Sequence, residues 1–545
     1  LLPLLLVAST GFAQNPLAIP PALDLDTFHL VTDEHVHQFY PSINTNTYGA
    51  SAEYLGPTLI LHRNDTARIW VHNQLAEMTS MHWHGMHVPG EMDGGPQRVI
   101  DPGDSWMAEF QVKNPAATYW YHPHPHELTA EQANFGIAGF IIVRDDEEEQ
   151  LALPRTYGVD DFPVVIQDRK FHASGDFAFY PFGDSVLVNG TPRPYLECPA
   201  QVVRLRLLNG SNARIYALGL DNGQAMQVIA GDAGLLPAPA STNRLWLSNG
   251  ERAEVLLDLT GMEGDSLMLM SYGGELPNTV PGSGNMLWES SLLNGVNFPV
   301  LRIRVAAPTP EPITEVPAAL LGIPMPTESE SIRTRTKTIT GMGMVGMGMF
   351  MINGLMFDLD VVNDTVQLNT VEVWNIVNNS NMAHPMHIHG VSFEVLARNG
   401  VPPPAHERGP KDVVLVDRFE TVKLVMRFGA VTDGWPFMYH CHNLLHEDNM
   451  MMLQYIVQDP TMSLADHHHH TMSVFPSPAS TTVRYRTEHA VQRIRIIDAR
   501  GRVLQDEART ASNEGAIDIH ALPQGLLLVE LQGEGRTTRS RLVKE

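Results

Sequence analysis

Cysteine is nearly absent from the sequence, with only Cys198 and Cys441 among 545 residues. A scaffold held by several disulfides is therefore excluded, and a chain of this length can instead bury several hydrophobic cores. Basic residues are also scarce, because 36 Lys and Arg stand against 61 Asp and Glu, a formal net charge of -25. This balance argues against a nucleic-acid-binding protein, whose phosphate contacts require Lys and Arg.

Long hydrophobic runs are missing as well. No segment reaches about 18 consecutive apolar residues, the length that indicates a membrane-spanning helix. The apolar stretch from Leu1 to Ala13 resembles the core of a secretory signal peptide, although no initial Met or basic segment precedes it. We therefore expect residues 1–13 to be a signal peptide truncated at its start. The protein is then exported, either secreted or held at the cell surface, or otherwise periplasmic.

Short segments of alternating apolar and polar residues, separated by Gly and Pro, run through most of the chain. The pattern predicts an all-β protein built from β-sandwiches. Changes in composition predict the following division: three domains at residues 25–146, 155–306 and 332–458, and a linker at residues 307–331.

The last part of the chain differs from the body. A linker at residues 459–471 contains the run His467 to His470, to which we assign no catalytic role. Residues 472–545 are rich in Arg and carry a nearly balanced charge, which predicts a separate module. Their strand-like segments predict a small C-terminal β-sandwich.

Four short segments carry most of the chemistry. Each holds a His-x-His or His-Cys-His element, and residues i and i+2 of a strand share one face, so each element can form half of a metal site. His35-Val36-His37 has the same spacing, but we interpret it as an ordinary strand. A thiolate together with imidazoles and a Met thioether suits copper. The segments contain His82, His84, His122, His124, His384, His387, His389, His440, Cys441 and His442, followed by His446 and Met451.

In order, spacing and flanking residues, the four segments resemble the copper-binding motifs of the multicopper oxidases, which include laccases, bilirubin oxidases and bacterial cuprous oxidases. The resemblance covers about residues 25–458. It implies three cupredoxin-like Greek-key β-sandwich domains, with copper sites in the third domain and between the first and third. The middle domain would be a scaffold. Residues 472–545 resemble the C-terminal sorting domain of the bacterial type IX secretion system, which implies secretion machinery as a partner.

The resemblance also implies four copper ions and their ligands. Because Cys441 would bind copper, Cys198 is left without a disulfide partner, and we expect it to be a buried structural thiol. His440 and His442 flank Cys441, so electrons that enter at the type 1 copper would reach the other three through one residue of backbone. The implied ligands are His384, Cys441, His446 and axial Met451 for type 1, His82 and His387 for type 2, and His84, His122, His124, His389, His440 and His442 for the type 3 pair.

Two acidic residues match those that serve dioxygen reduction in bacterial members of the family. They are Asp93, in a Gly-Gly-Pro turn, and Glu447, next to His446. A carboxylate near a metal-bound oxygen species can relay protons and orient ligand imidazoles. An ordinary turn-forming Asp is the alternative interpretation of Asp93.

The predicted function is that of an oxidase that couples one-electron oxidation of a donor to four-electron reduction of dioxygen. Its partners would be O2 and a small reducing substrate or Cu(I), and we expect a monomer. The alternatives are a protein that sequesters copper at the cell surface, or a copper nitrite reductase, whose family lacks the paired trinuclear motifs.

The electron donor stays open between phenols or aromatic amines and Cu(I). A Met-rich run at residues 341–351 favours Cu(I), which soft thioethers select. Ser380, however, stands where cuprous oxidases carry an Asp, and their long Met-rich insert is missing. Alternating Met could instead line one face of a buried strand, and a phenol would need only an open pocket beside His446 or His384. The candidate Cu(I) ligands are Met342, Met344, Met347, Met349 and Met382.

Overall fold

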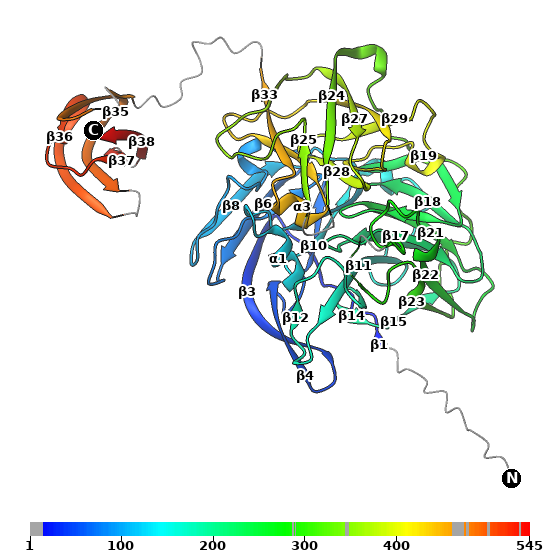
Figure 1. The fold of residues 1–545 in the computed structure, drawn as a ribbon. Helices are drawn as coiled ribbons and strands as arrows, with labels where there is room; N and C mark the ends of the chain where they lie inside the picture. The colour runs from blue at the N-terminus through cyan, green and yellow to red at the C-terminus, as the bar shows by residue number, and fades with distance from the viewer. Residues whose placement is uncertain are drawn as a thin grey trace. The chain divides into compact units, whose positions relative to one another are not determined.

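The computed structural model describes residues 15–285, 288, 290–343, 348–459, 473–475, 479–498, 502–533 and 536–544. Strands make up most of it (Figure 1), as predicted. One compact unit lies within residues 1–459 and another within residues 460–545. The helices of the described residues are short, and none is long and apolar enough to span a membrane. They are α1 (Thr129–Phe135), α2 (Asp146–Glu149) and α3 (Leu444–Asp448), with 3-10 turns η1 (Gly90–Met92), η2 (Gly273–Glu275), η3 (Glu328–Glu330) and η4 (Ala405–Glu407).

The first sandwich packs a five-stranded sheet against a four-stranded one. Alternation places Ile69 and Val71 of β6 in its core, together with Trp83 and Ile141. The segment His35-Val36-His37 is part of a strand, β3, as expected. The first sheet has the order β2 (Ala22–Asp24), β5 (Thr58–His62), β10 (Gly139–Arg144), β9 (Ala117–His122), β7 (His82–His84); the second has β4 (Ile43–Ala50), β3 (Thr27–Tyr40), β6 (Thr66–Asn73), β8 (Ser105–Gln111).

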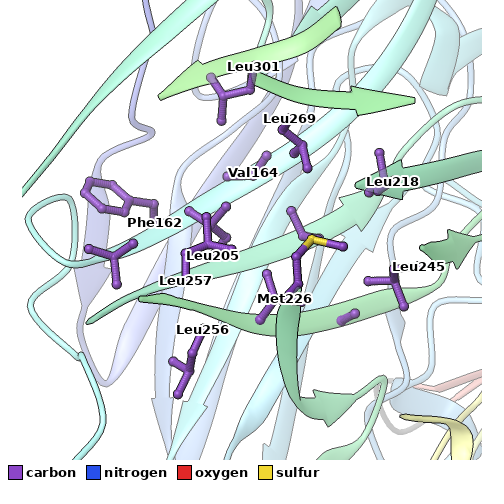
Figure 2. Close-up of a cluster of buried hydrophobic side chains, with 14 of the residues drawn as sticks. Phe162, Val164, Leu205, Leu218, Met226, Leu245, Leu256, Leu257, Leu269 and Leu301 are labelled. Carbon is purple, nitrogen blue, oxygen red and sulfur yellow. The ribbon is translucent and has the colours of Figure 1, made fainter. Parts of the chain in front are cut away.

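The middle sandwich has a Leu- and Val-rich core between its two sheets (Figure 2). Cys198 is fully buried in this core, as expected for a structural thiol. One sheet has the order β1 (Asn15–Pro16), β15 (Pro194–Pro199), β23 (Asn297–Ala306), β22 (Ser266–Tyr272), β17 (Tyr216–Leu220), β20 (Leu245–Leu247). The other has β14 (Thr191–Pro192), β13 (Ser185–Val188), β11 (Asp161–Phe171), β16 (Val202–Asn209), β21 (Arg252–Asp258), β18 (Met226–Gly231), β19 (Gly234–Thr242), with β12 (Phe177–Ala178) beside β11.

The outer face of the larger middle sheet is polar but buried, because the first sandwich covers it. The guanidinium of Arg206 donates to Thr118 Oγ1 on β9 at 2.9 Å and to Glu254 Oε1 on β21 at 2.7 Å. Both residues of the ion pair are at most 1% exposed. Buried charges must be paired and hydrogen-bonded, so this network fixes the first and middle sandwiches against each other.

The third sandwich completes the larger unit. Its core includes Trp374, Leu424 and Tyr439, and Ala130 and Ala133 of α1 pack into the same cluster from the first sandwich. One sheet has the order β25 (Met349–Ile352), β24 (Ser331–Met342), β27 (Val371–Asn378), β31 (Thr421–Arg427), β29 (Phe393–Arg398); the other has β26 (Asp364–Gln367), β33 (Met452–Gln458), β32 (Phe437–Cys441), β28 (His384–Ile388), β30 (Val413–Val416).

The C-terminal unit has its own core, with Val483, Ile494, Ile496 and Val529 fully buried. Its strands form one sheet around this core, and register shifts between the two longest strands show where they bend. The strands are β34 (Ser473–Phe475), β35 (Thr482–Asp498), β36 (Val503–Asp518), β37 (Gly525–Gly533) and β38 (Arg536–Lys544). The expected signal peptide and the His run of the linker lie outside the described residues.

Candidate metal centres

The four predicted motifs lie on two pairs of neighbouring strands. In the first sandwich β7 pairs with β9, which places His82 opposite His122. In the third sandwich β28 pairs with β32, which places His387 opposite His440. Residues opposite each other on neighbouring strands project to the same side of a sheet. Each strand pair therefore presents imidazoles from two motifs together.

Strand alternation also separates the motif residues into two groups. On β32, Cys441 lies between His440 and His442 and projects to the opposite side. On β28, His384 is three residues before His387, so these two also project to opposite sides. His384 therefore joins Cys441, whereas His387 joins His440 on the other side. One stretch of sheet thus supports two distinct centres.

The first centre is mononuclear in its geometry. The Sγ of Cys441 lies 3.5 Å from Nδ1 of His384 and 3.5 Å from Nδ1 of His446, which α3 supplies. All three side chains are at most 1% exposed. Burial lowers the pKa of His446 to about 3 and raises the pKa of the Cys441 thiol. Ser380 Oγ donates to Asn378 Oδ1 at 2.7 Å, so it accepts a hydrogen bond from Nε2–H of His384 at 2.9 Å. The lone pair of His384 is then on Nδ1.

The three consecutive methionines after α3 have different surroundings. Met451 is fully buried in the same core cluster as Cys441, and its backbone oxygen accepts a hydrogen bond of 3.1 Å from the Cys441 nitrogen. Met450 and Met452 instead pack in a separate cluster with Phe357. Of the three, the environment of Met451 is the one that matches an axial ligand.

The second centre contains two groups of three imidazoles. Each group combines histidines from both strand pairs. His84 Nδ1 lies 3.4 Å from His122 Nε2 and 3.2 Å from His442 Nε2. The other group consists of His124, His389 and His440, whose ligand nitrogens lie within 4.8 Å of one another. Each group mixes residues of the first and third sandwiches, so the centre exists only where the two sandwiches meet.

His82 and His387 form the remaining pair of this centre. His82 Nδ1 donates to the backbone oxygen of Asp93 at 2.9 Å, and His387 Nδ1 donates to that of Asp412 at 2.8 Å. In both residues Nε2 is buried and has no hydrogen-bond partner among the described residues. A buried acceptor without a partner is costly unless a ligand satisfies it. These two nitrogens are therefore available to bind a ligand that is not part of the protein.

Burial keeps His82, His84, His122 and His387 of this centre neutral at neutral pH. It lowers the pKa of His122 to about 4 and the pKa of His82, His84 and His387 well below 6.5, with further lowering by neighbouring imidazoles. Neutral imidazole is the form that binds a metal ion, so no proton has to leave first.

The two predicted acidic residues both contact this centre. Asp93 Oδ2 accepts from His389 Nδ1 at 2.8 Å, and Glu447 lies 3.2 Å from His124 Nδ1 and 3.1 Å from His440 Nδ1. Burial raises the pKa of Asp93 to about 6 against the opposing effects of His82 and His440. Burial also raises the pKa of Glu447, but its imidazole neighbours outweigh that effect and the result is about 2.

Comparisons with known proteins identify the family. Models described as multicopper oxidase match residues 34–148 and 326–461, and one described as a secretion system C-terminal sorting domain matches residues 473–545. The multicopper oxidase mco of Staphylococcus haemolyticus is 34% identical over 427 residues, which cover 76% of this chain and 85% of the relative. The cell division protein FtsP of Escherichia coli is 35% identical over 464 residues, which cover 83% and 94%.

A solved structure gives the same result. The bacterial laccase-like multi-copper oxidase CueO from Ochrobactrum sp. is 33% identical, with a TM-score of 0.73 over 81% of this chain and all of that chain. This chain belongs to the multicopper oxidase family. It is an oxidoreductase with dioxygen as the electron acceptor, and it carries a type IX secretion sorting domain at its C-terminus.

The donors of this oxidase fit copper, the metal that the family implies. The first centre offers one soft thiolate and two imidazoles, a set that favours copper over harder ions. The second offers imidazole nitrogens, including the unpartnered Nε2 atoms of His82, His124 and His387.

The candidate Cu(I) ligands of the oxidase do not form one surface site among the described residues. Met342 and Met349 are opposite each other on β24 and β25 and are 79% and 64% exposed. Met382 is fully buried in the third core. The buried face of β25 holds Phe350 and Ile352, so the alternative that alternating Met fill a buried face is wrong for Met349. Met344 and Met347 lie outside the described residues.

Sequence reasoning missed two residues at these centres. Ser380 was noted only as a departure from a cuprous site, whereas its hydroxyl bonds His384. Asp412, which precedes β30, was not considered, although its Oδ1 lies 3.1 Å from His84 Nε2. No spacing signal marks Asp412, because its contact depends on which strands pair. Ser380 contacts His384 across only four residues, in the loop before β28. His87, three residues after His84 of the first motif, contacts Ser392 Oγ at 2.9 Å rather than a motif histidine.

Proposed function

We propose that this oxidase takes electrons one at a time at a type 1 copper and passes them to three coppers at which dioxygen is reduced to water. The proposed type 1 ligands are His384, Cys441, His446 and Met451. The proposed type 2 ligands are His82 and His387, and the type 3 ligands are His84, His122, His124, His389, His440 and His442. Each bound copper ion would carry one electron, so four ions together could deliver the four electrons that dioxygen requires.

The single observation that carries the proposal is the connection between the two centres. Cys441 and the imidazoles of His440 and His442 are adjacent along one strand end and face opposite sides. Another covalent connection, from His384 to His387 along β28, is longer, with two residues between the ligands. An electron that arrives on the Cys441 sulfur therefore has a short covalent path to both groups of three imidazoles.

Protein groups would supply and guide the protons. Asp93, with a pKa of about 6, can hold or release a proton near neutral pH beside His389. Glu447 stays ionised at neutral pH and orients His124 and His440 through their Nδ1 atoms. Both carboxyl groups are at most 2% exposed, so solvent protons reach dioxygen only through such groups or ordered water.

Replacement of the sulfur tests the type 1 assignment. Cys441→Ser keeps a small polar side chain but removes the soft thiolate, so the copper-loaded variant should lose the intense blue absorption and nearly all oxidase turnover. Its circular dichroism should match that of the wild type, because the site is small relative to the core. Cys198→Ser is the matched control and should stay blue. A blue, active Cys441→Ser protein would contradict the assignment.

For the electron donor, we infer Cu(I) rather than a phenol. The ligand imidazoles of the first centre are shielded, because the Phe350 ring lies 4.7 Å from His384 and 4.6 Å from His446, centroid to centroid. Phe350 follows the exposed thioether of Met349 directly on β25. A soft ion held by Met342 and Met349 would thus be separated from the type 1 ligands by the backbone of β25 and one aromatic side chain. A phenol, in contrast, has no exposed imidazole to approach.

Paired substrates test the donor. Met342→Leu with Met349→Leu removes both sulfurs while nearly preserving volume. Cu(I) oxidation should fall severalfold, and oxidation of a small phenol should stay within about a factor of two of the wild type, since both donors feed the same type 1 copper. Met78→Leu, at another exposed methionine, is the control. Equal losses for both substrates, or none, would favour phenols, a choice that the lignin-directed activity named for the Ochrobactrum relative also supports.

The sorting domain supports export by the type IX pathway and display at the cell surface. An oxidase placed there would meet dioxygen and its donor outside the cytoplasm. The net charge of -25 would attract cations to that surface.

A further inference from the structure

The middle sandwich supplies none of the proposed copper ligands, yet two of its residues lie beside the cluster, one against His442 and one behind Asp412. Gly250, in the turn before β21, has a φ of 79°, and a Cβ on it would lie 2.9 Å from the His442 ring. Arg252, the first residue of β21, extends to Asp412 of the third sandwich. These contacts make the middle sandwich part of the wall around the cluster.

All five N–H groups of the Arg252 guanidinium donate hydrogen bonds, which fix the side chain in place. Nη1 and Nη2 each donate to one oxygen of Asp412 at 2.6 Å. The remaining three N–H groups donate to the backbone oxygens of Gly250, Asp232 and Thr118 at 3.0, 2.7 and 3.0 Å. Arg252 and Asp412 are at most 1% exposed. A two-point pair of this kind holds a carboxylate in position and orientation.

Asp412 in turn contacts two histidines from two different motifs. Its Oδ1 lies 3.1 Å from Nε2 of His84, and its backbone oxygen accepts from Nδ1 of His387 at 2.8 Å. An ionised carboxylate only accepts, so the proton of His84 must be on Nε2 and the lone pair on Nδ1. For His387 the proton is on Nδ1 and the lone pair on Nε2. One residue therefore selects opposite ring nitrogens in two proposed ligands.

The selection matches the geometry of the cluster. The Nδ1 of His84 is the atom that faces Nε2 of His122 and Nε2 of His442. If the Asp412 carboxylate did not hold the proton on Nε2, the proton could move to Nδ1 and occupy the ligand position. The glycine of the first motif makes room for this arrangement: a Cβ on Gly85, whose φ is 84°, would collide with Asp412 Oδ2 and Arg252 Nη2.

We propose that Arg252 and Asp412 are positioning residues that fix the Nδ1-ligating form of His84, and that the middle sandwich thereby sets how tightly the type 3 pair holds copper. This inference rests on the proposed function, since it concerns the same cluster. It assigns the middle sandwich a role in metal retention in addition to its role as a scaffold.

Two variants test the proposal from opposite ends of the pair. In Asp412→Asn an amide replaces the carboxylate and offers only one oxygen, so it cannot accept from both Arg252 nitrogens and from His84. In Arg252→Lys the charge stays but the two-point geometry is lost. Partners that orient metal ligands typically contribute 10- to 100-fold in affinity. We expect each variant to release type 3 copper to a competing chelator at about 10- to 100-fold lower chelator concentration than the wild type.

Asp161→Asn is the matched control. Asp161 forms an equally buried two-point pair with Arg206 in the same sandwich, at 2.7 and 2.9 Å. The partners of Asp161 among the described residues are arginines and backbone groups, and none is a cluster histidine. This variant therefore loses a comparable buried ion pair without touching His84, and it should retain type 3 copper like the wild type.

The measurement is copper per full-length, copper-loaded chain after dialysis against increasing chelator, with the blue absorption followed in the same samples. Asp412→Asn and Arg252→Lys should lose cluster copper early while the blue absorption persists, because the type 1 ligands do not contact the pair. Variants that hold cluster copper as tightly as Asp161→Asn would overturn the proposal. A wild-type chain that holds no copper beyond the blue ion would instead overturn the proposed function, so the two failures are distinguishable.

Discussion

At the scale of single residues, burial and neighbouring hydrogen-bond partners decide the pKa of each carboxyl group. The two carboxyl groups beside the cluster differ for this reason. Asp93 has one oxygen bonded to His389 and another without a hydrogen-bond partner among the described residues, and burial raises its pKa to about 6. Glu447 lies between His124 and His440, which hold its pKa at about 2. Only Asp93 can therefore exchange a proton near neutral pH.

Asp93→Asn tests that difference. The amide can still accept from His389 Nδ1, so the ligand stays in place, but it cannot hold or release a proton. Reduction of the blue copper by the donor under anaerobic conditions should match the wild type. Reoxidation by dioxygen should slow by about 100-fold or more, the usual contribution of a positioned acid. Stopped-flow absorbance measures the two half-reactions separately, and a defect confined to reduction would contradict the role of Asp93.

Copper-free protein offers a second residue-scale prediction. Burial holds the pKa of His82, His84, His122, His384 and His446 below 6.5 in the folded chain, so the unfolded chain binds more protons in acid. Stability is then unaffected above about pH 6.5 and falls as the pH decreases below it, by up to about 2 kcal/mol per histidine at pH 5. The melting temperature of the apoprotein should drop steeply between pH 7 and 5. A flat profile would show that these imidazoles are not buried.

At the scale of strands and helices, sequence periodicity predicted what depends on local spacing. The two-residue repeat predicted that His440 and His442 project to one side and Cys441, the last residue of β32, to the other. The structure has this arrangement. The all-β character followed from the same repeat and is confirmed. Contacts between distant strands were not predictable in this way. Asp412 reaches His84 only because β30 pairs with β28, and nothing in its own neighbourhood marks it.

The Met-rich hairpin shows the same limit. Its composition indicated a soft-metal surface or a buried face, and the sequence could not choose between them. Pairing of β24 with β25 turns Met342 and Met349 outward and Phe350 inward, against His384. The register of a hairpin decides which alternate residues face solvent, and a shift of one residue would exchange them.

At the scale of the whole molecule, the described residues form a catalytic body and a separate C-terminal unit with its own core. We expect that the body cannot be shortened, since the proposed cluster takes ligands from the first and third sandwiches and the middle sandwich holds Arg252. The C-terminal unit contributes none of the proposed ligands. A chain that ends at Asp459 should therefore retain turnover within about a factor of two, measured as dioxygen uptake per bound copper. A large loss would show that the sorting domain supports catalysis.

In the proposed function, electrons taken one at a time are delivered to dioxygen as a set of four. The most direct measurement counts donor molecules oxidised per dioxygen consumed, with hydrogen peroxide assayed in the same reaction. For a one-electron donor, we expect four molecules oxidised for each dioxygen and no accumulation of peroxide. Two molecules per dioxygen, with peroxide released in equal amount to the dioxygen consumed, would contradict it.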